Sequence, residues 1–171
     1  MTFLRRFAEN RGAVAGLLVL GIVVLIAIFT PMLSTADPWK SVGRPLTPPG
    51  GDFLLGTDML GRDVLAGILF GARISLLIGI LSAVVSALIG VTVGAIAGFF
   101  GGWVDDVLVR ITEFFQTIPS FIFAILLVAI LTPGLTSIVV AIAVVTWPPI
   151  ARLARAEFMT LRRREAGPTN R

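Results

Sequence analysis

Three long stretches without a charged residue dominate the chain, and the short segments between them hold nearly all of its charge. The charge-free stretches cover residues 12–36, 74–104 and 114–151. A transmembrane helix needs about 20 predominantly apolar residues, because the hydrocarbon core of a membrane is about 30 Å thick. Each stretch is long enough to cross a membrane, so the sequence predicts an all-α, polytopic membrane protein.

Local breaks divide these stretches into four predicted transmembrane helices. The glycines of "GFFGG" at residues 98–102 are expected to end the second helix, and the turn signal "TPGLTS" at residues 132–137 splits the third stretch into a helical hairpin. The first apolar run is about 20 residues long, whereas the apolar region of a cleaved signal peptide has about 7–15, so we expect it to be retained. The predicted crossings cover about residues 13–33, 74–98, 118–131 and 136–150.

Prolines lie near the ends of two predicted helices. Pro119 stands near the start of the third helix, where its missing N–H group is harmless. Pro148 and Pro149 are expected to kink or end the fourth helix, with Trp147 as an aromatic residue of the membrane interface. Whether Trp147, Pro148 and Pro149 have a further role stays open at this point.

The distribution of arginines predicts the orientation of the chain. Basic residues collect before the first apolar stretch and after the last one, whereas residues 37–73 carry four basic and four acidic residues. Segments rich in Lys and Arg tend to stay in the cytoplasm. Both termini are therefore expected in the cytoplasm, with residues 37–73 outside and residues 101–113 on the cytoplasmic side again.

The composition excludes several classes of protein. The 171 residues are 56% hydrophobic and 14% charged, with a net charge of +4 and neither cysteine nor histidine. The excess of positive charge lies beside apolar segments, so we interpret it as a determinant of membrane topology rather than as a nucleic-acid site. No catalytic constellation or phosphate-binding loop is present, and the predicted crossings contain no ionisable residue. We therefore expect no enzyme, cofactor, metal site or proton-coupled carrier, and an energy source outside the chain.

Three of the four aspartates in the segment between the first two predicted crossings lie close together: Asp52, Asp58 and Asp63. A cation site is one interpretation, but the spacing does not match an EF-hand loop. Pairing with Arg62 and Arg73, or simple solvation, is the preferred interpretation.

Small residues recur every four positions along the second predicted helix. They are Ser82, Ser86, Gly90, Gly94 and Gly98. Residues four apart lie on one ridge of a helix, and small side chains there let another backbone approach closely. The pattern predicts a helix-packing face, whose partner could lie in this chain or in another one.

Three separated segments resemble permease subunits of bacterial peptide-type ABC importers. They are "LLGTDMLGRDVLAGILFGARISLLIGI" at residues 54–80, "AGFFGGWVDDVLVRITEFFQTIPSFIFAILLVAIL" at residues 97–131 and "VVTWPPIARLARAEFMTLRRRE" at residues 144–165. With the N-terminal anchor, the resemblance covers residues 1–165 and leaves a divergent tail at residues 166–171. The first segment carries the "GTDxxGRD" pattern of the C-type subunits of dipeptide, oligopeptide and nickel importers. The matching residues are Gly56, Thr57, Asp58, Gly61, Arg62 and Asp63.

The resemblance implies a fold, a location and partners. The fold would be that of a type I ABC importer permease, which normally has six transmembrane helices, in the bacterial inner membrane. The partners would be a second permease subunit, two cytoplasmic ATP-binding subunits and a periplasmic or lipid-anchored solute-binding protein. The cargo would be peptides, or nickel or another small solute.

The end of the chain resembles the start of the family's ATPase-coupling loop. The residues at this start are Arg152, Arg155, Glu157 and Glu165. The family would continue with a coupling helix of the "EAAxxxG" type and two more transmembrane helices, whereas residues 166–171 read "AGPTNR", in which Gly167 and Pro168 disfavour a helix. We therefore expect a chain that is truncated or frameshifted relative to the family.

Two alternatives to a transporting permease remain open from the sequence. One is a non-transporting membrane protein that binds a permease through its small-residue ridge. The other is an inactive fragment.

Overall fold

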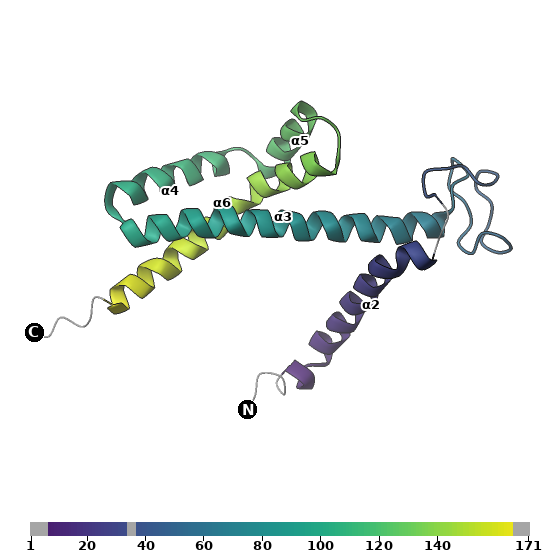
Figure 1. The fold of residues 1–171 in the computed structure, drawn as a ribbon, viewed down its shortest axis with the longest axis horizontal. Helices are drawn as coiled ribbons and strands as arrows, with labels where there is room; N and C mark the ends of the chain where they lie inside the picture. Colours follow the sequence, from purple (N-terminus) through teal and green to yellow (C-terminus); the bar gives the residue numbers. More distant parts are fainter. Residues whose placement is uncertain (1–6, 34–36, 166–171) are drawn as a thin grey trace, which may run out of the picture. The chain divides into compact units, whose positions relative to one another are not determined.

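Long α-helices make up most of the described chain. This computed structural model describes residues 7–33 and 37–165, with side chains up to Arg162. Isolated β-bridges join residues only within the loop between the first two long helices, as far as the described residues go. The helices are α2 (Arg11–Leu33), α3 (Val64–Phe100), α4 (Gly102–Thr117), α5 (Ser120–Ile130) and α6 (Leu135–Glu165) (Figure 1).

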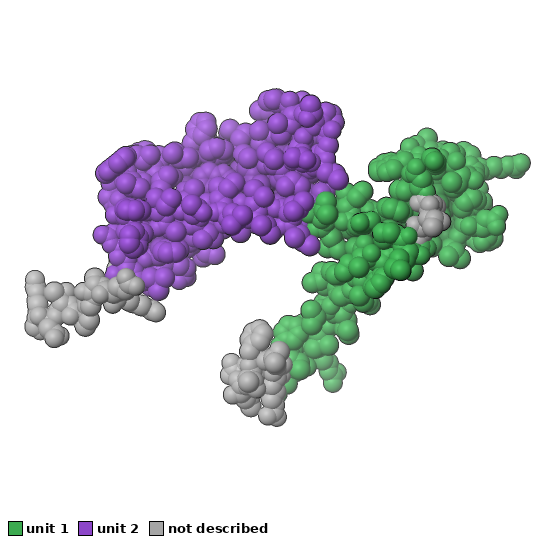
Figure 2. All heavy atoms as spheres, viewed as in Figure 1, with its two compact units in different colours: residues 1–77 green, residues 78–171 purple. Residues whose placement is uncertain are grey.

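The chain divides into two compact units, residues 1–77 and 78–171, which are coloured separately in Figure 2. The first unit holds α2, the loop that follows it and the beginning of α3. The second unit holds the remainder of α3 together with α4, α5 and α6. Helix α3 thus supplies residues to both units.

The helices include three or four candidate membrane crossings. Helices α2 and α3 and residues 135–162 of α6 are each long and apolar enough to cross a membrane. Helices α4 and α5 meet this condition only as a pair, and they are bent by 85° at the break between them. The predicted all-α class with membrane-spanning helices is therefore confirmed, while the bounds of each crossing stay predictions.

Two helices extend beyond the ranges expected from the sequence. Helix α3 begins at Val64 instead of near residue 74, and α6 continues through Pro148 and Pro149 to Glu165. Of the two expected effects of these prolines, a kink or an end of the fourth helix, the end does not occur, and the kink stays a prediction. Buried residues flank the prolines, Trp147 on one side and Ala151 on the other. Packing at these residues holds the helix together where the prolines donate no backbone hydrogen bond.

Helix α4 occupies a segment that the sequence analysis left as a return to the cytoplasmic side. Its buried or half-buried residues recur at helical spacing, as in Asp105, Leu108, Thr112 and Phe115. Phe115 packs edge-on against Trp147 of α6, with ring centroids 5.3 Å apart. Trp147 is only 6% exposed, so its ring packs inside the chain, while its place at the membrane interface stays a prediction.

In the first unit, a buried threonine joins α2 to the beginning of α3. The hydroxyl of Thr30 lies 2.7 Å from the carbonyl oxygen of Ile26, one turn earlier in α2, and 3.2 Å from that of Leu69 in α3. Thr30 is completely buried. The two helices are therefore held at this point by a polar contact inside an otherwise apolar surface.

In the second unit, α6 is the neighbour of the small residues along α3. A Cβ atom at Gly90 would lie 2.7 Å from Cβ of Ile150, and a Cβ atom at Gly98 would lie 2.8 Å from Cβ of Phe158. At Gly94 the added atom would overlap the carbonyl oxygen of Ala151. The backbones approach this closely only because α3 has no side chains at these positions.

Two serines extend the same contact along α3. Ser82 and Ser86 are both buried, and the hydroxyl of Ser86 lies 2.6 Å from that of Thr146 in α6. The Ser86 hydroxyl also donates to the carbonyl of Ser82, 2.7 Å away. A hydrogen bond between side chains therefore supplements the close packing of the glycines.

We expect Gly94→Ala to lower the stability of the second unit by about 1–3 kcal/mol, because the new methyl group forces α3 away from α6. The matched control is Gly79→Ala, in the same helix, where an added Cβ meets nothing within 4 Å. Thermal unfolding of the purified chain in detergent measures both effects. Equal midpoints for the two variants would contradict the packing described here.

Candidate functional site

The six residues of the "GTDxxGRD" pattern lie together in the loop between α2 and α3. Gly56 and Gly61 have backbone φ angles of 74° and 71°, a region that disfavours residues with a side chain. A Cβ atom at Gly56 would overlap the carbonyl oxygen of Thr47, and one at Gly61 would overlap that of Gly43. Both glycines are therefore required by their backbone angle and by a close approach of the chain.

Thr57 ties two turns of this loop together. Its hydroxyl accepts a hydrogen bond from the N–H of Thr47 at 2.9 Å and donates one to the carbonyl of Arg44 at 2.5 Å. The N–H of Thr57 also donates to the carbonyl of Thr47, 3.1 Å away. Thr57 is buried, so these bonds satisfy polar groups that water does not reach.

Asp58 organises the turn that follows. One of its carboxylate oxygens accepts hydrogen bonds from the N–H groups of Leu60 at 2.8 Å and Arg62 at 2.9 Å. The bond from the Arg62 N–H group is the main reason why the pKa of Asp58 lies below its usual value, and the positive charge of Arg62 acts in the same direction. The carboxylate is thus an acceptor for the loop backbone.

The last two residues of the pattern form the entry to α3. A carboxylate oxygen of Asp63 accepts the N–H group of Leu65 at 2.9 Å, which caps the first turn of the helix. The guanidinium of Arg62 lies 5.8 Å from the ring centroid of Trp39. In the described chain, no ion pair joins Asp52, Asp58 or Asp63 to Arg62 or Arg73. Of the two preferred interpretations of these aspartates, pairing or simple solvation, pairing with those side chains is therefore not observed.

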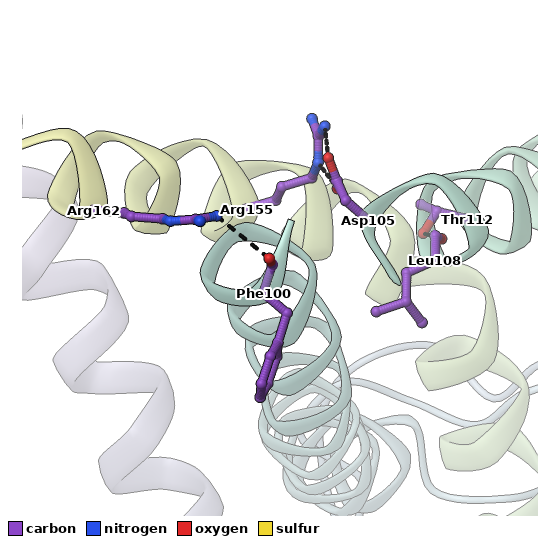
Figure 3. A network of polar contacts seen from close by, with 6 residues as sticks. All are labelled: Phe100, Asp105, Leu108, Thr112, Arg155 and Arg162. Carbon is purple, nitrogen blue, oxygen red and sulfur yellow. Dashed lines mark hydrogen bonds and ion pairs between the residues drawn. The ribbon is translucent and has the colours of Figure 1, made fainter. Parts of the chain in front are cut away.

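A second polar group lies at the corner between α3 and α4, where α6 passes by (Figure 3). Arg155 of α6 donates two hydrogen bonds to Asp105 of α4, at 2.5 Å from Nε and 2.6 Å from Nη2. Asp105 is 8% exposed. The side chains of Arg155 and Asp105 are 32% and 11% exposed, so the pair is partly buried. A two-pronged ion pair of this kind fixes orientation as well as distance, and removing Arg155 leaves the less exposed carboxylate without its partner.

A second arginine of α6 reaches the end of α3. Arg162 Nη1 donates to the carbonyl oxygen of Phe100 at 3.4 Å, in the last residue of α3 (Figure 3). Gly101 and Gly102, with φ angles of 65° and 55°, then turn the chain into α4. A cation at the C-terminal end of a helix also interacts favourably with the helix dipole.

The residues assigned from the sequence to the start of a coupling loop have different surroundings. Arg155 is held by Asp105, and both Arg155 and Arg152 line a small cleft of about 90 Å³ together with Glu113. Glu157 is exposed on α6. The backbone of α6 extends to Glu165, but the side chain of Glu165 and residues 166–171 lie outside the description. The expected divergence after Glu165 therefore cannot be placed in this fold.

Sequence reasoning missed Asp105 and the polar contacts inside the helix bundle. Asp105 directly follows a charge-free stretch and was counted as a loop charge, although its partner Arg155 lies 50 residues further along the chain. The amphipathic spacing of residues 104–115 was the available signal for α4. No local pattern marks Thr30 or Thr146 as partners of α3.

Comparison with known proteins decides the family. A family described as "Binding-protein-dependent transport system inner membrane component" matches residues 90–166. The family "N-terminal TM domain of oligopeptide transport permease C" matches residues 2–49. The chain belongs to the OppC/DppC-type permeases. These are membrane components of ABC transporters and not enzymes, as expected from the sequence.

Individual relatives match most of this chain and about half of their own length. The di/tripeptide permease protein DppC of Pseudomonas aeruginosa is 42% identical over 92% of this chain and 54% of the relative. The oligopeptide permease protein OppC of Escherichia coli K12 is 42% identical over 94% of this chain and 54% of the relative. OppC of Bacillus subtilis is 38% identical over 94% and 53%. The chain therefore spans about half the length of the curated relatives that it matches.

We expect Gly61→Ala to open the loop between α2 and α3. The new methyl group combines an unfavourable φ angle, at about 1–2 kcal/mol, with an overlap against Gly43. The control is Gly51→Ala, which has a φ angle of 58° but nothing within 4 Å of the added atom. Backbone hydrogen exchange of residues 42–63 should rise markedly in the first variant and only slightly in the second. Equal exchange in both would contradict the role given to this close approach.

Proposed function

We propose that this chain forms part of the membrane pathway of an ABC importer for peptides. In this proposal it acts with a second permease subunit, two cytoplasmic ATP-binding subunits and a solute-binding protein. The observation that carries the proposal is the match to a binding-protein-dependent transport family over residues 90–166, the segment that forms most of the second unit. The peptide cargo is supported by the relatives, which are named as dipeptide and oligopeptide permeases.

The arrangement of charge supports an energy source outside the chain. The charged residues of the second unit, as far as its side chains are described, lie along α4 and on α6 from Arg152 onward, where a cytoplasmic partner could reach them. The apolar parts of α3 and α6 hold only small hydroxyl groups at their contact, such as Ser86 and Thr146. Such an interior suits helices that are moved by attached subunits better than it suits a proton relay.

The alternative of a non-transporting protein that binds a permease through the small-residue ridge loses its support. Gly90, Gly94 and Gly98 are covered by α6 of the same chain, so that ridge is no free docking surface. A permease is therefore the better proposal. Nickel or another small solute remains the alternative cargo, and an uptake assay distinguishes it from peptides.

ATP-dependent uptake tests the proposal. The chain is reconstituted in liposomes with the second permease, the ATP-binding subunits and the binding protein encoded with it. We expect labelled di- or oligopeptides to accumulate only when ATP and this chain are both present, with liposomes that lack the chain as the control. Accumulation of Ni²⁺ but not of peptide would show that the cargo is nickel and not peptides. Failure of every cargo would refute the transport function for this chain.

We also propose that both termini lie in the cytoplasm and that residues 37–73 lie outside. Cysteine labelling tests this orientation directly, because the chain has no cysteine of its own. Met59 lies in the loop between α2 and α3 and is 80% exposed, and Thr160 is exposed near the end of α6. We expect a membrane-impermeant maleimide to label Met59→Cys in intact cells, and Thr160→Cys only after the membrane is opened. The reverse pattern would invert the orientation and would leave the fold unchanged.

A further inference from the structure

Arg155 lies where α3, α4 and α6 meet. A Cβ atom at Gly94 would lie 2.8 Å from the backbone nitrogen of Arg155, and one at Gly98 would lie 2.8 Å from its carbonyl oxygen. The side chain of Arg155 extends to Asp105 in the first turn of α4. One residue of α6 therefore contacts the backbone of α3 and a carboxylate of α4.

Helix α4 is attached to α6 near both of its ends. Asp105 meets Arg155 near the beginning of α4, and Phe115 meets Trp147 near its end. These pairs run in opposite directions along the two helices, so α4 and α6 are antiparallel. The aromatic contact allows sliding and tilting, because it lacks the directional bonds of a guanidinium with a carboxylate. The ion pair between Asp105 and Arg155 is therefore the contact that defines the angle between α4 and α6.

Beyond Arg155, α6 is held by its contact with α3, where a Cβ atom at Gly98 would lie 2.8 Å from Cβ of Phe158. Other residues of this part of α6 face away from the protein, since Glu157 is exposed and Leu161 is 50% exposed. Seven residues after Arg155, the bond from Arg162 to Phe100 is long, at 3.4 Å, and lies on the surface. An exposed contact of this length constrains a helix less than a partly buried, two-pronged ion pair.

We infer that Asp105, acting through Arg155, is a positioning residue that sets the direction in which the last turns of α6 pass the α3–α4 corner. In this arrangement residues 94–105 and 151–162 behave as one body. Its consequence for transport rests on the proposed function: a force applied by an ATP-binding subunit to the end of α6 would reach α3 and α4 through this pair. Neither family match assigns a role to Asp105.

The distance between two spin labels tests the inference on the chain alone. Labels are attached to Trp103→Cys in the first turn of α4, where the side chain is 76% exposed, and to Thr160→Cys in α6. We expect one narrow distance in the otherwise unchanged chain and in the control Asp106→Asn, which alters the exposed neighbouring carboxylate. Asp105→Asn and Arg155→Lys should both lose the single narrow distance. A narrow distribution in Asp105→Asn would overturn the inference.

A double variant separates positioning from stability. Asp105→Leu combined with Arg155→Met removes both charges, so no charge is left buried without a partner. We expect its thermal midpoint to recover toward that of the unchanged chain, while the distance distribution stays wide. A narrow distribution in this variant would show that packing alone directs α6 and would also overturn the inference.

The transport assay then measures the consequence separately. In the reconstituted importer we expect Asp105→Asn to reduce peptide uptake per ATP hydrolysed, with Asp106→Asn unchanged. If the unchanged chain supports no uptake, the proposed function fails, whereas the spin-label distances still decide the role of Asp105. Reduced coupling together with an unchanged distance would contradict the positioning role.

Discussion

The close approach of α3 to α6 is the contact on which the second unit depends. Three glycines spaced by four residues let the backbone of α6 lie directly against α3, and the two buried serines continue that surface. In a membrane, water provides no hydrophobic driving force between helices, so association depends on such close packing and on hydrogen bonds like that of Ser86 with Thr146. This register determines which residues of α6 lie against α3 at Gly90, Gly94 and Gly98.

The ion pair at the α3–α4 corner is a consequence of the same register. Because Gly94 and Gly98 receive the backbone of Arg155, the guanidinium is presented to the side of α3 from which α4 returns. The turn at Gly101 and Gly102 brings Asp105 back within reach of it. A substitution that separates α3 from α6 would therefore also separate Arg155 from Asp105, so the effects of changes at Gly94 and Asp105 should not be additive.

The sequence predicts the helical class and several particular features, and the reasons for its failures are physical. Hydropathy locates α2, α3 and α6, because the requirement to span an apolar layer acts on each segment alone. The spacing of Gly90, Gly94 and Gly98 predicts a packing face, because residues four apart lie on one ridge of a single helix. Pro148 was misjudged because its local tendency to end a helix is outweighed by burial against neighbouring helices, which the sequence does not display. The partner of Arg155 could not be found, since it depends on a turn and a register set elsewhere in the chain.

The "GTDxxGRD" pattern shows the limit of reading function from a recognised motif. Its glycines, hydroxyl and carboxylates all bond to, or make room for, the backbone of the loop between α2 and α3 or of the first turn of α3. A motif whose polar atoms are directed at its own chain fixes a shape rather than a chemical site. The exposed surface of that loop, at Met59 and Trp39 for example, is formed by residues outside the pattern. Differences in recognition between permeases with this motif should therefore lie in the residues that the constant loop shape presents, because those residues can vary without disturbing the backbone bonds beneath them.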